Sequence, residues 1–477
     1  MTMGGISENT AFGGKDYKEE TYDFGGSGRK TFTAAFDGFS TNRKSGRLTV
    51  TGKNCAIGKN GGASPAFALK TAKVGGFIGA FPTADGVTFA RIATPSEYGG
   101  GVIYKDAVAV GTDKALYRYD ENAGAWEATG ITFTALPKIQ PYFDRDGRES
   151  AIFFGGKVAY YTVGGTTAVT ANHCYKNLGC VACDRIFFAD DDKTVRFSGV
   201  ISKDSFTDSA DEGGKIAFPV SSGLRGICAL GKYVYAFFAK QAYRLDARGA
   251  ARDFSAEEVP YAGGEIKADS PVCCGDKICF IADDGAYVFD GTRFTNFTAE
   301  SETIDFSAAK SCRSIGVPGK FLYEIVPAES GAGQTAAATR RIYDTEAGTS
   351  AEIDLSLENA CSYGDFAYVF SGGEEKQIVF DGSADENREY RLERENEDFG
   401  KAGRKTLRKI VLRGKGAVRL AVTGGSNSAV YTMELDEAGK SVQPRLSAEK
   451  FSFVLHLKSG ARVSGVKAEY SAFGGEI

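Results

Sequence analysis

Short runs of apolar residues alternate with polar turns along most of the chain, and the pattern contains no long amphipathic helix. The clearest unit extends from Asp276 to Asp290. Its first apolar run ends at Ile281, a turn follows at Asp283–Gly285, and a second run continues to Phe289. An Asp-Gly pair supplies the positive φ angle that a tight hairpin turn requires. The pattern therefore predicts a β-hairpin here.

Looser copies of this hairpin recur at intervals of about 45 residues, the length of a four-stranded propeller blade. The clearer copies begin at Asp106, Asp184 and Gly231, and weaker ones begin near Ser150, Gly319 and Gly364. Within one period we predict strands at 270–274, 277–281, 286–289 and 293–297. The predicted fold is therefore all-β, with a β-propeller of six or seven blades over residues 53–384. A β-sandwich or a solenoid would also give regularly spaced strands.

The repeat stops near residue 385, where a densely charged segment extends to residue 400. Apolar residues then alternate with polar ones in five stretches, at 407–412, 418–422, 431–435, 451–457 and 463–470. Five or more such strands within about 90 residues are typical of a small β-sandwich, which we predict for residues 385–477. Residues 1–52 are polar and glycine-rich. We predict an N-terminal arm there, or the strand that closes the propeller ring.

The composition agrees with many short strands joined by tight turns. Glycine accounts for 61 of the 477 residues, close to 13% against a usual value of about 7%. Hydrophobic residues make up 42% of the chain, which excludes global disorder. The glycines do not recur every third residue, so the chain is not a collagen.

Charge and cysteine content restrict the class of function. The formal net charge of −4 does not suggest a dedicated nucleic-acid-binding protein. Several of the ten cysteines lie in apolar runs, as buried reduced thiols do, which indicates folding in a reducing cytoplasm. We expect no secretion signal, because residues 1–14 are polar, and no membrane span, because no apolar stretch approaches about 20 residues.

Candidate sites for metal, acid–base or phosphate chemistry are weak. His173, Cys174, Cys180 and Cys183 contain zinc-ligand types, but a strand containing the last two would turn their thiols to opposite faces. The runs Asp190–Asp192 and Asp283–Asp284 fall at predicted turns, where aspartate is favoured by local hydrogen bonding. The loop 25–31 lacks the spacing of a phosphate-binding loop. With only two histidines, we predict no catalytic residues, no metal site and no cofactor.

A basic stretch between residues 388 and 419 is the more informative candidate. It contains eleven Lys or Arg residues and five Asp or Glu residues, a surplus of +6 (11 − 5) within a chain of net charge −4. Such a surplus suits DNA phosphates or an acidic partner, and it also suits a solvated strand face. The residues that we predict to face a partner or DNA are Arg404, Lys405, Arg408, Lys409 and Arg413.

Two parts of the chain resemble β-propeller structural proteins of the bacteriophage tail or neck, of the tail-nozzle or stabilization class. The C-terminal part consists of the charged run 390–400, which ends in Asp-Phe-Gly, the strand-like run 404–412, and the run 418–424. The N-terminal part is the stretch 36–47, in which Phe-Asp-Gly-Phe leads into a basic, glycine-containing segment. In that class a charged segment of this kind precedes a β-sandwich.

The resemblance implies a non-enzymatic structural part of the virion, assembled in the host cytoplasm. Its copies would form a ring that docks on portal, adaptor, tail-tube or fibre proteins and lets genomic DNA pass. Two other functions remain open at this point. One is a propeller-fold glycoside hydrolase or lyase with acids at the blade tops. The other is an intracellular propeller scaffold that binds proteins.

Overall fold

The structure is a computed structural model in which the chain divides into two compact units. It describes residues 17–18, 29–36, 39–40, 47–71, 88–98, 101–111, 113–120, 123, 125–162, 166–298, 304–327, 337–358, 360–371, 374–399 and 402–473. One unit comprises residues 70–340 and 355–378, and the other comprises residues 1–69, 341–354 and 379–477. Helix is limited, among these residues, to the turns η1 (Tyr175–Asn177) and η2 (Ala251–Asp253), and none is long and apolar enough to span a membrane.

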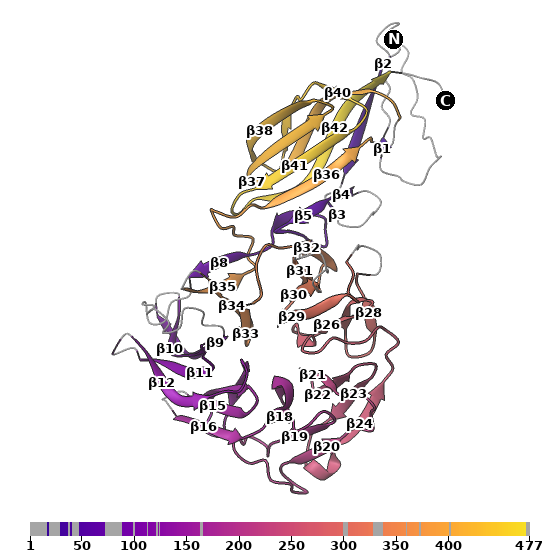
Figure 1. Ribbon diagram of the computed structural model, residues 1–477. Coiled ribbons are helices and arrows are strands. Elements are labelled where there is room, and N and C mark those ends of the chain that lie inside the picture. Colours follow the sequence, from indigo (N-terminus) through magenta and orange to yellow (C-terminus); the bar gives the residue numbers. More distant parts are fainter. Residues whose placement is uncertain are drawn as a thin grey trace, which may run out of the picture. The chain divides into compact units, whose positions relative to one another are not determined.

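Six four-stranded sheets form the blades of a β-propeller in the first unit (Figure 1). The first three are β9 (Thr88–Tyr98), β10 (Gly101–Val110), β11 (Ala115–Asp120) and β12 (Ala125–Thr132); β13 (Lys138–Phe143), β14 (Glu149–Phe154), β15 (Val158–Thr162) and β16 (Thr166–Ala171); and β17 (Gly179–Ala182), β18 (Arg185–Ala189), β19 (Thr194–Phe197) and β20 (Gly214–Ala217).

The other three blades continue the same order. They are β21 (Leu224–Leu230), β22 (Tyr233–Phe238), β23 (Ala242–Asp246) and β24 (Ser255–Val259); β25 (Val272–Cys273), β26 (Ile278–Ala282), β27 (Gly285–Phe289) and β28 (Phe294–Asn296); and β33 (Ala360–Tyr363), β34 (Phe366–Ser371), β35 (Glu374–Val379) and β8 (Ala68–Thr71). The hairpin β29 (Ala309–Val317) and β30 (Lys320–Pro327) stands between the last two, where β29 contacts both β25 and β33. The prediction of an all-β chain with a propeller is confirmed.

Blade strands form where the sequence places apolar residues on both faces. The second strands β14, β18, β22 and β26 are buried almost throughout, because each lies in the middle of a sheet and between neighbouring blades. At the hairpin that the sequence marks most clearly, Gly285 has φ +147°, which accounts for the glycine in the turn.

The second unit is a β-sandwich of two sheets that share one long strand, β37 (Lys405–Gly424). The first half of β37 lies in a sheet with β1 (Tyr17–Lys18), β2 (Arg29–Phe36), β42 (Arg462–Phe473), β39 (Lys440–Val442), β40 (Leu446–Ala448), β6 (Cys55–Ile57) and β7 (Ala63–Pro65). The second half lies in a sheet with β38 (Asn427–Leu435), β41 (Phe451–Leu457), β36 (Arg391–Glu397), β5 (Thr51–Lys53), β32 (Thr349–Glu352) and β31 (Thr339–Asp344). β3 (Phe39–Ser40) and β4 (Leu48–Thr49) form a separate parallel pair.

The observed division of the chain differs from the predicted one. Strand β2, in the segment that we expected to be an arm, pairs with β42 over eight residues, from Arg29↔Phe473 to Phe36↔Val466. It pairs there because Phe32, Ala34 and Phe36 alternate inward and are buried in the sandwich core. Residues 53–69 also belong mainly to the sandwich unit, and the strand that completes the last blade is β8 rather than a strand within 1–52.

Strand β37 changes sheets at a bend made by two glycines. The pairing register with β42 shifts between Arg413 and Gly414, and Gly414 and Gly416 have φ angles of +152° and +81°. A Cβ atom on Gly414 would lie 2.0 Å from the carbonyl oxygen of Arg462. Bends of this kind let one strand turn the corner between two packed sheets.

We expect Gly414→Ala to destabilise the sandwich by about 2–3 kcal/mol, because the new methyl group meets a backbone carbonyl and the residue keeps a positive φ angle. The readout is faster amide hydrogen exchange in peptides that cover β37 and β42. Gly425→Ala is the matched control, because Gly425 also has a positive φ angle, +61°, but no heavy atom lies within 4 Å of its added Cβ. Equal effects of the two substitutions would contradict the steric account.

Candidate anion-binding face of the β-sandwich

The basic residues predicted from sequence lie at the start of β37, and most of them point away from the sandwich core. Leu407, Ile410 and Leu412 are buried inside it. Arg408 and Arg413 are exposed, and the side chain of Lys409 is 38% exposed. Arg404 is an exposed residue immediately before the strand.

A β-bulge places two consecutive basic residues outside. The register with β42 passes from Leu407↔Tyr470 directly to Lys409↔Glu469, so that Arg408 has no pairing partner of its own. A bulge interrupts the strict alternation of a strand, so neighbouring side chains can lie on one face. Regular alternation from Leu407 would have turned Lys409 toward the core.

Lys405 is a correction to the predicted set, because its side chain lies inside the sandwich. Only 1% of Lys405 is exposed. Its Nζ atom donates hydrogen bonds to the carbonyl oxygens of Gly403 at 2.7 Å and Glu449 at 2.8 Å. Burial lowers the pKa of this ammonium group, although nearby carboxylates oppose the shift, Asp398 most strongly. Lys405 therefore stabilises the end of the sheet and is not available to a partner.

Strand β42 contributes charges that the sequence analysis did not connect with β37. Lys467 pairs with Val411 and Glu469 pairs with Lys409, so their side chains emerge beside the basic residues. Glu469 Oε1 lies 3.9 Å from Lys409 Nζ and 3.5 Å from Lys467 Nζ. The signal was present as alternation in β42, because Val466, Ala468 and Tyr470 point inward and leave the intervening residues outside.

Hydroxyl groups line the basic residues on the same face. Thr406 Oγ1 and Ser447 Oγ are 2.7 Å apart across β37 and β40. Arg408 Nε donates a hydrogen bond to Ser471 Oγ at 3.2 Å, which holds the guanidinium beside β42. We define the basic face as the set Thr406, Arg408, Lys409, Arg413, Ser447, Lys467, Glu469 and Ser471. These residues carry four cations and one carboxylate.

The outer face of the other sheet provides a contrast within the same unit. Backbone pairing places Lys53, Arg391, His456 and Arg419 in a row across β5, β36, β41 and β37. Carboxylates accompany this row. Arg391 Nη2 lies 3.4 Å from Glu393 Oε2, and His456 Nδ1 lies 3.4 Å from Glu389 Oε1. Burial is the main cause of the lowered pKa of His456. Two carboxylates, Glu389 and Glu393, stand beside the three Lys and Arg residues of this row, so its positive surplus is smaller than that of the basic face.

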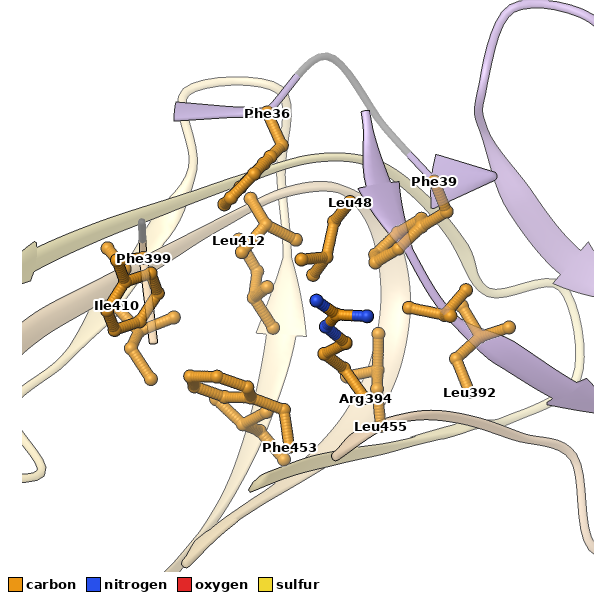
Figure 2. Close-up of a pocket in the computed structure, with 14 residues that line it drawn as sticks. Phe36, Phe39, Leu48, Leu392, Arg394, Phe399, Ile410, Leu412, Phe453 and Leu455 are labelled. Atoms are coloured by element: carbon orange, nitrogen blue, oxygen red, sulfur yellow. The ribbon is translucent and has the colours of Figure 1, made fainter. Parts of the chain in front are cut away.

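The interior of the sandwich contains an apolar cavity of about 30 Å³ (Figure 2). Its lining residues are Phe36, Phe39, Leu48, Val50, Leu392, Arg394, Phe399, Ile410, Leu412, Leu420, Phe453, Leu455, Val466 and Ala468. Arg394 is the charged member, and its Nε atom donates to Glu397 Oε2 at 2.8 Å. A volume of this size has room for a few water molecules at most, and an apolar lining offers water few partners. We interpret the cavity as a packing gap.

The other candidate residues, the cysteines considered as metal ligands, are not brought together into a site. Cys174 Sγ contacts the carbonyl oxygen of Leu178 and Cys183 Sγ contacts that of Lys232, so these two thiols have separate partners. Within the described part of the chain, no group of three or more His, Cys, Asp or Glu residues could hold a metal ion. All ten cysteines are free thiols.

Both aspartate runs lie at turns, as predicted, and Asp191 makes the local backbone hydrogen bond that favours aspartate there. Asp191 Oδ1 accepts a hydrogen bond from the Lys193 N–H at 2.8 Å, and this local bond lowers the pKa of Asp191. Asp284 Oδ2 accepts a hydrogen bond from the Tyr287 hydroxyl at 2.7 Å. The glycines of the 25–31 loop lie outside the described residues.

Distant structural similarity links the chain to solved structures of other proteins. No family model matches the chain, and no curated protein matches it. One similar solved structure is PorZ, a bacterial surface component of the type-IX secretion system of Porphyromonas gingivalis, with 12% identity and a TM-score of 0.39 over 74% of this chain. Another is Chaetomium thermophilum Raptor, with 10% identity and a TM-score of 0.40 over 68% of this chain. The matched regions span 46% of PorZ and 28% of Raptor.

Proposed function

We propose that the chain is a non-enzymatic structural component of a bacteriophage virion, located in the tail or neck. Copies of the chain form a ring that docks on portal, adaptor, tail-tube or fibre proteins, and genomic DNA passes through the assembly during ejection. Assembly takes place in the host cytoplasm, and the virion is the final location.

One observation carries this proposal. The two stretches that resemble phage propeller proteins, 36–47 and 390–424, are more than 300 residues apart in sequence, yet their described residues pack into one domain. Phe36 and Phe39 from the first stretch line the same cavity as Phe399 and Leu412 from the second (Figure 2). Both stretches therefore contribute to the same sandwich. This supports the interpretation that the resemblance concerns one whole domain rather than two separate short motifs.

The Asp-Phe-Gly segment has a structural role that agrees with the proposal. Phe399 is 2% exposed, and its ring stacks on Tyr470 with centroids 4.8 Å apart. The buried carboxylate of Glu397 accepts a hydrogen bond from the Phe399 N–H at 2.7 Å. Glu397 and Phe399 thus anchor the end of the charged segment in the sandwich core, which is a structural role.

The test combines assembly with activity. We expect the chain, co-expressed with phage portal and adaptor proteins and then purified, to form a ring of several copies in native mass spectrometry. We also expect it to leave a panel of glycans unchanged. The proposal would be overturned in favour of a hydrolase or lyase if the chain stayed monomeric, did not bind those proteins, and showed glycan turnover that one Asp→Asn substitution abolished.

A further inference from the structure

The basic face concentrates positive charge in a chain whose net charge is negative. Four cations, Arg408, Lys409, Arg413 and Lys467, adjoin one carboxylate on two neighbouring strands. Screening limits such electrostatic effects to about 8–10 Å at physiological salt, so the local surplus matters more than the total of −4. We infer that the basic face binds the phosphate backbone of a polynucleotide. The inference rests on this face alone and does not depend on the proposed virion role.

The basic face contains the kinds of side chain that donate hydrogen bonds to phosphate oxygens. Protein contacts to a nucleic-acid backbone come from Arg and Lys and from the hydroxyls of Ser and Thr. On the basic face, Ser471 is buried and positions Arg408, and the hydroxyls of Thr406 and Ser447 are hydrogen-bonded to each other, so one of these two hydroxyls keeps its hydrogen for a ligand. The Nη groups of Arg408, together with that one hydroxyl, offer several donors to one phosphate group.

The apolar content of the face favours a nucleic acid over an acidic protein. Among the side chains that the structure describes on the neighbouring strands, the outward-facing apolar ones beside this face are Ala35, which is small, and Val411, which is half-buried. Stable protein interfaces are usually centred on buried aromatic or large apolar anchors. Interfaces with nucleic acid are more polar and more positively charged. The chemistry of the face therefore matches a polynucleotide better.

The dimensions of the face suit a few consecutive phosphates. Lys409 and Arg413 are four residues apart on β37, which corresponds to roughly 13 Å along a strand. One strand of duplex DNA carries a phosphate for about every 3.4 Å of axis, so this length spans roughly four phosphates. No aromatic side chain belongs to the defined basic face, so we infer backbone contact without base stacking or sequence preference.

The test measures binding of a fluorescent 20-nucleotide oligo-dT by anisotropy between 50 and 200 mM salt. With three or four phosphate contacts, the slope of log K against log salt is expected to be about −2 to −3 for the native chain. The triple variant Arg408→Gln, Lys409→Gln, Arg413→Gln is expected to reduce the size of this slope by about 2. Its affinity at 50 mM salt should fall by at least tenfold.

The matched control removes the same charge from the other sheet. Lys53→Gln, Arg391→Gln, Arg419→Gln also changes the net charge by −3, but on the face where carboxylates accompany the cations. We expect this variant to retain oligo-dT affinity within about twofold. Equal losses in the two triple variants would overturn the assignment, since binding would then follow total charge rather than the basic face.

A second probe separates nucleic acid from an acidic protein. Poly-glutamate of similar charge is expected to bind the native chain at least tenfold more weakly than oligo-dT, and equal affinity would overturn the inference. Thermal unfolding checks that each variant is folded. If the triple variant is unfolded, Arg413→Gln alone replaces it, with an expected reduction of about 0.7 in the slope. An unchanged slope in that single variant would also overturn the inference. Neither result depends on ring assembly.

Discussion

Glu324→Gln is expected to destabilise the propeller unit by about 2–4 kcal/mol. The Glu324 side chain is 2% exposed and lies on β30, where Oε1 accepts a hydrogen bond from Arg313 at 2.5 Å and Oε2 accepts one from Arg340 at 2.6 Å. Oε2 also accepts the backbone N–H of Leu357 at 3.1 Å. Removal of one member of a buried ionic group leaves its partners uncompensated. The arginine side chains are 38% and 31% exposed, so water offsets part of that loss.

The measurement is chemical unfolding followed by the fluorescence of Trp126, the single tryptophan of the chain, which lies on β12 in the propeller. This probe reports the propeller unit without contributions from the sandwich. Glu358→Gln is the control, because Glu358 is 67% exposed and lies 3.6 Å from the same arginine, Arg313. We expect it to change stability by less than about 0.5 kcal/mol. A comparable loss in both variants would contradict the role of the buried carboxylate.

The effect of Glu324 should depend on pH. Burial acts to raise the pKa of Glu324, but hydrogen bonds from Arg340, the Leu357 N–H and Arg313 outweigh burial, and the pKa is lowered overall. The stabilisation is therefore fully present above the unfolded-state pKa of about 4.3 and is lost as the pH falls through the lower folded-state pKa. The stability difference between native chain and Glu324→Gln should shrink as pH decreases below about 4. A constant difference down to pH 3 would contradict this linkage.

Local sequence patterns were sufficient to predict the blade hairpins. Strands expected at 277–281 and 286–289 appear as β26 and β27, within about one residue at each end. The prediction succeeded because the turn, through Gly285, and the two apolar runs that flank it all lie within fifteen consecutive residues. Such short-range features depend little on the rest of the fold.

The pairing of segments that are far apart in the chain could not be predicted from local sequence patterns. The alternation of Phe32, Ala34 and Phe36 indicates a strand, but nothing near it specifies β42 as the neighbour. The same limit explains Lys405. A lysine in a basic run suggests exposure, whereas its burial depends on the carbonyl of Glu449, 44 residues away. Sequence thus indicated which residues carry charge, and the long-range pairing decided which of them share the basic face.

Arg185→Met is expected to have the largest effect on stability, a loss of about 3–5 kcal/mol in the propeller unit. Arg185 is fully buried, and its guanidinium donates hydrogen bonds to the carbonyl oxygens of Ser198 at 2.6 Å, Gly249 at 2.9 Å and Glu212. It also lies over the ring of Phe254, 5.2 Å from the centroid. Methionine has no donor for these carbonyls, and each buried acceptor left unpaired costs about 1–3 kcal/mol.

The positions of the three carbonyl acceptors explain why Arg185 is expected to affect the stability of the propeller unit so strongly. Ser198 and Glu212 belong to the loop between β19 and β20, whereas Gly249 follows β23 of the next blade, so the guanidinium connects two blades. Arg185→Lys should lose slightly less stability than Arg185→Met, because a single ammonium group cannot reach all three carbonyls. Arg252→Gln is the control, since Arg252 is 65% exposed and pairs with Asp211 at the surface. Small and equal effects of all three substitutions on unfolding monitored by Trp126 fluorescence would show that the blades are held together by apolar packing alone.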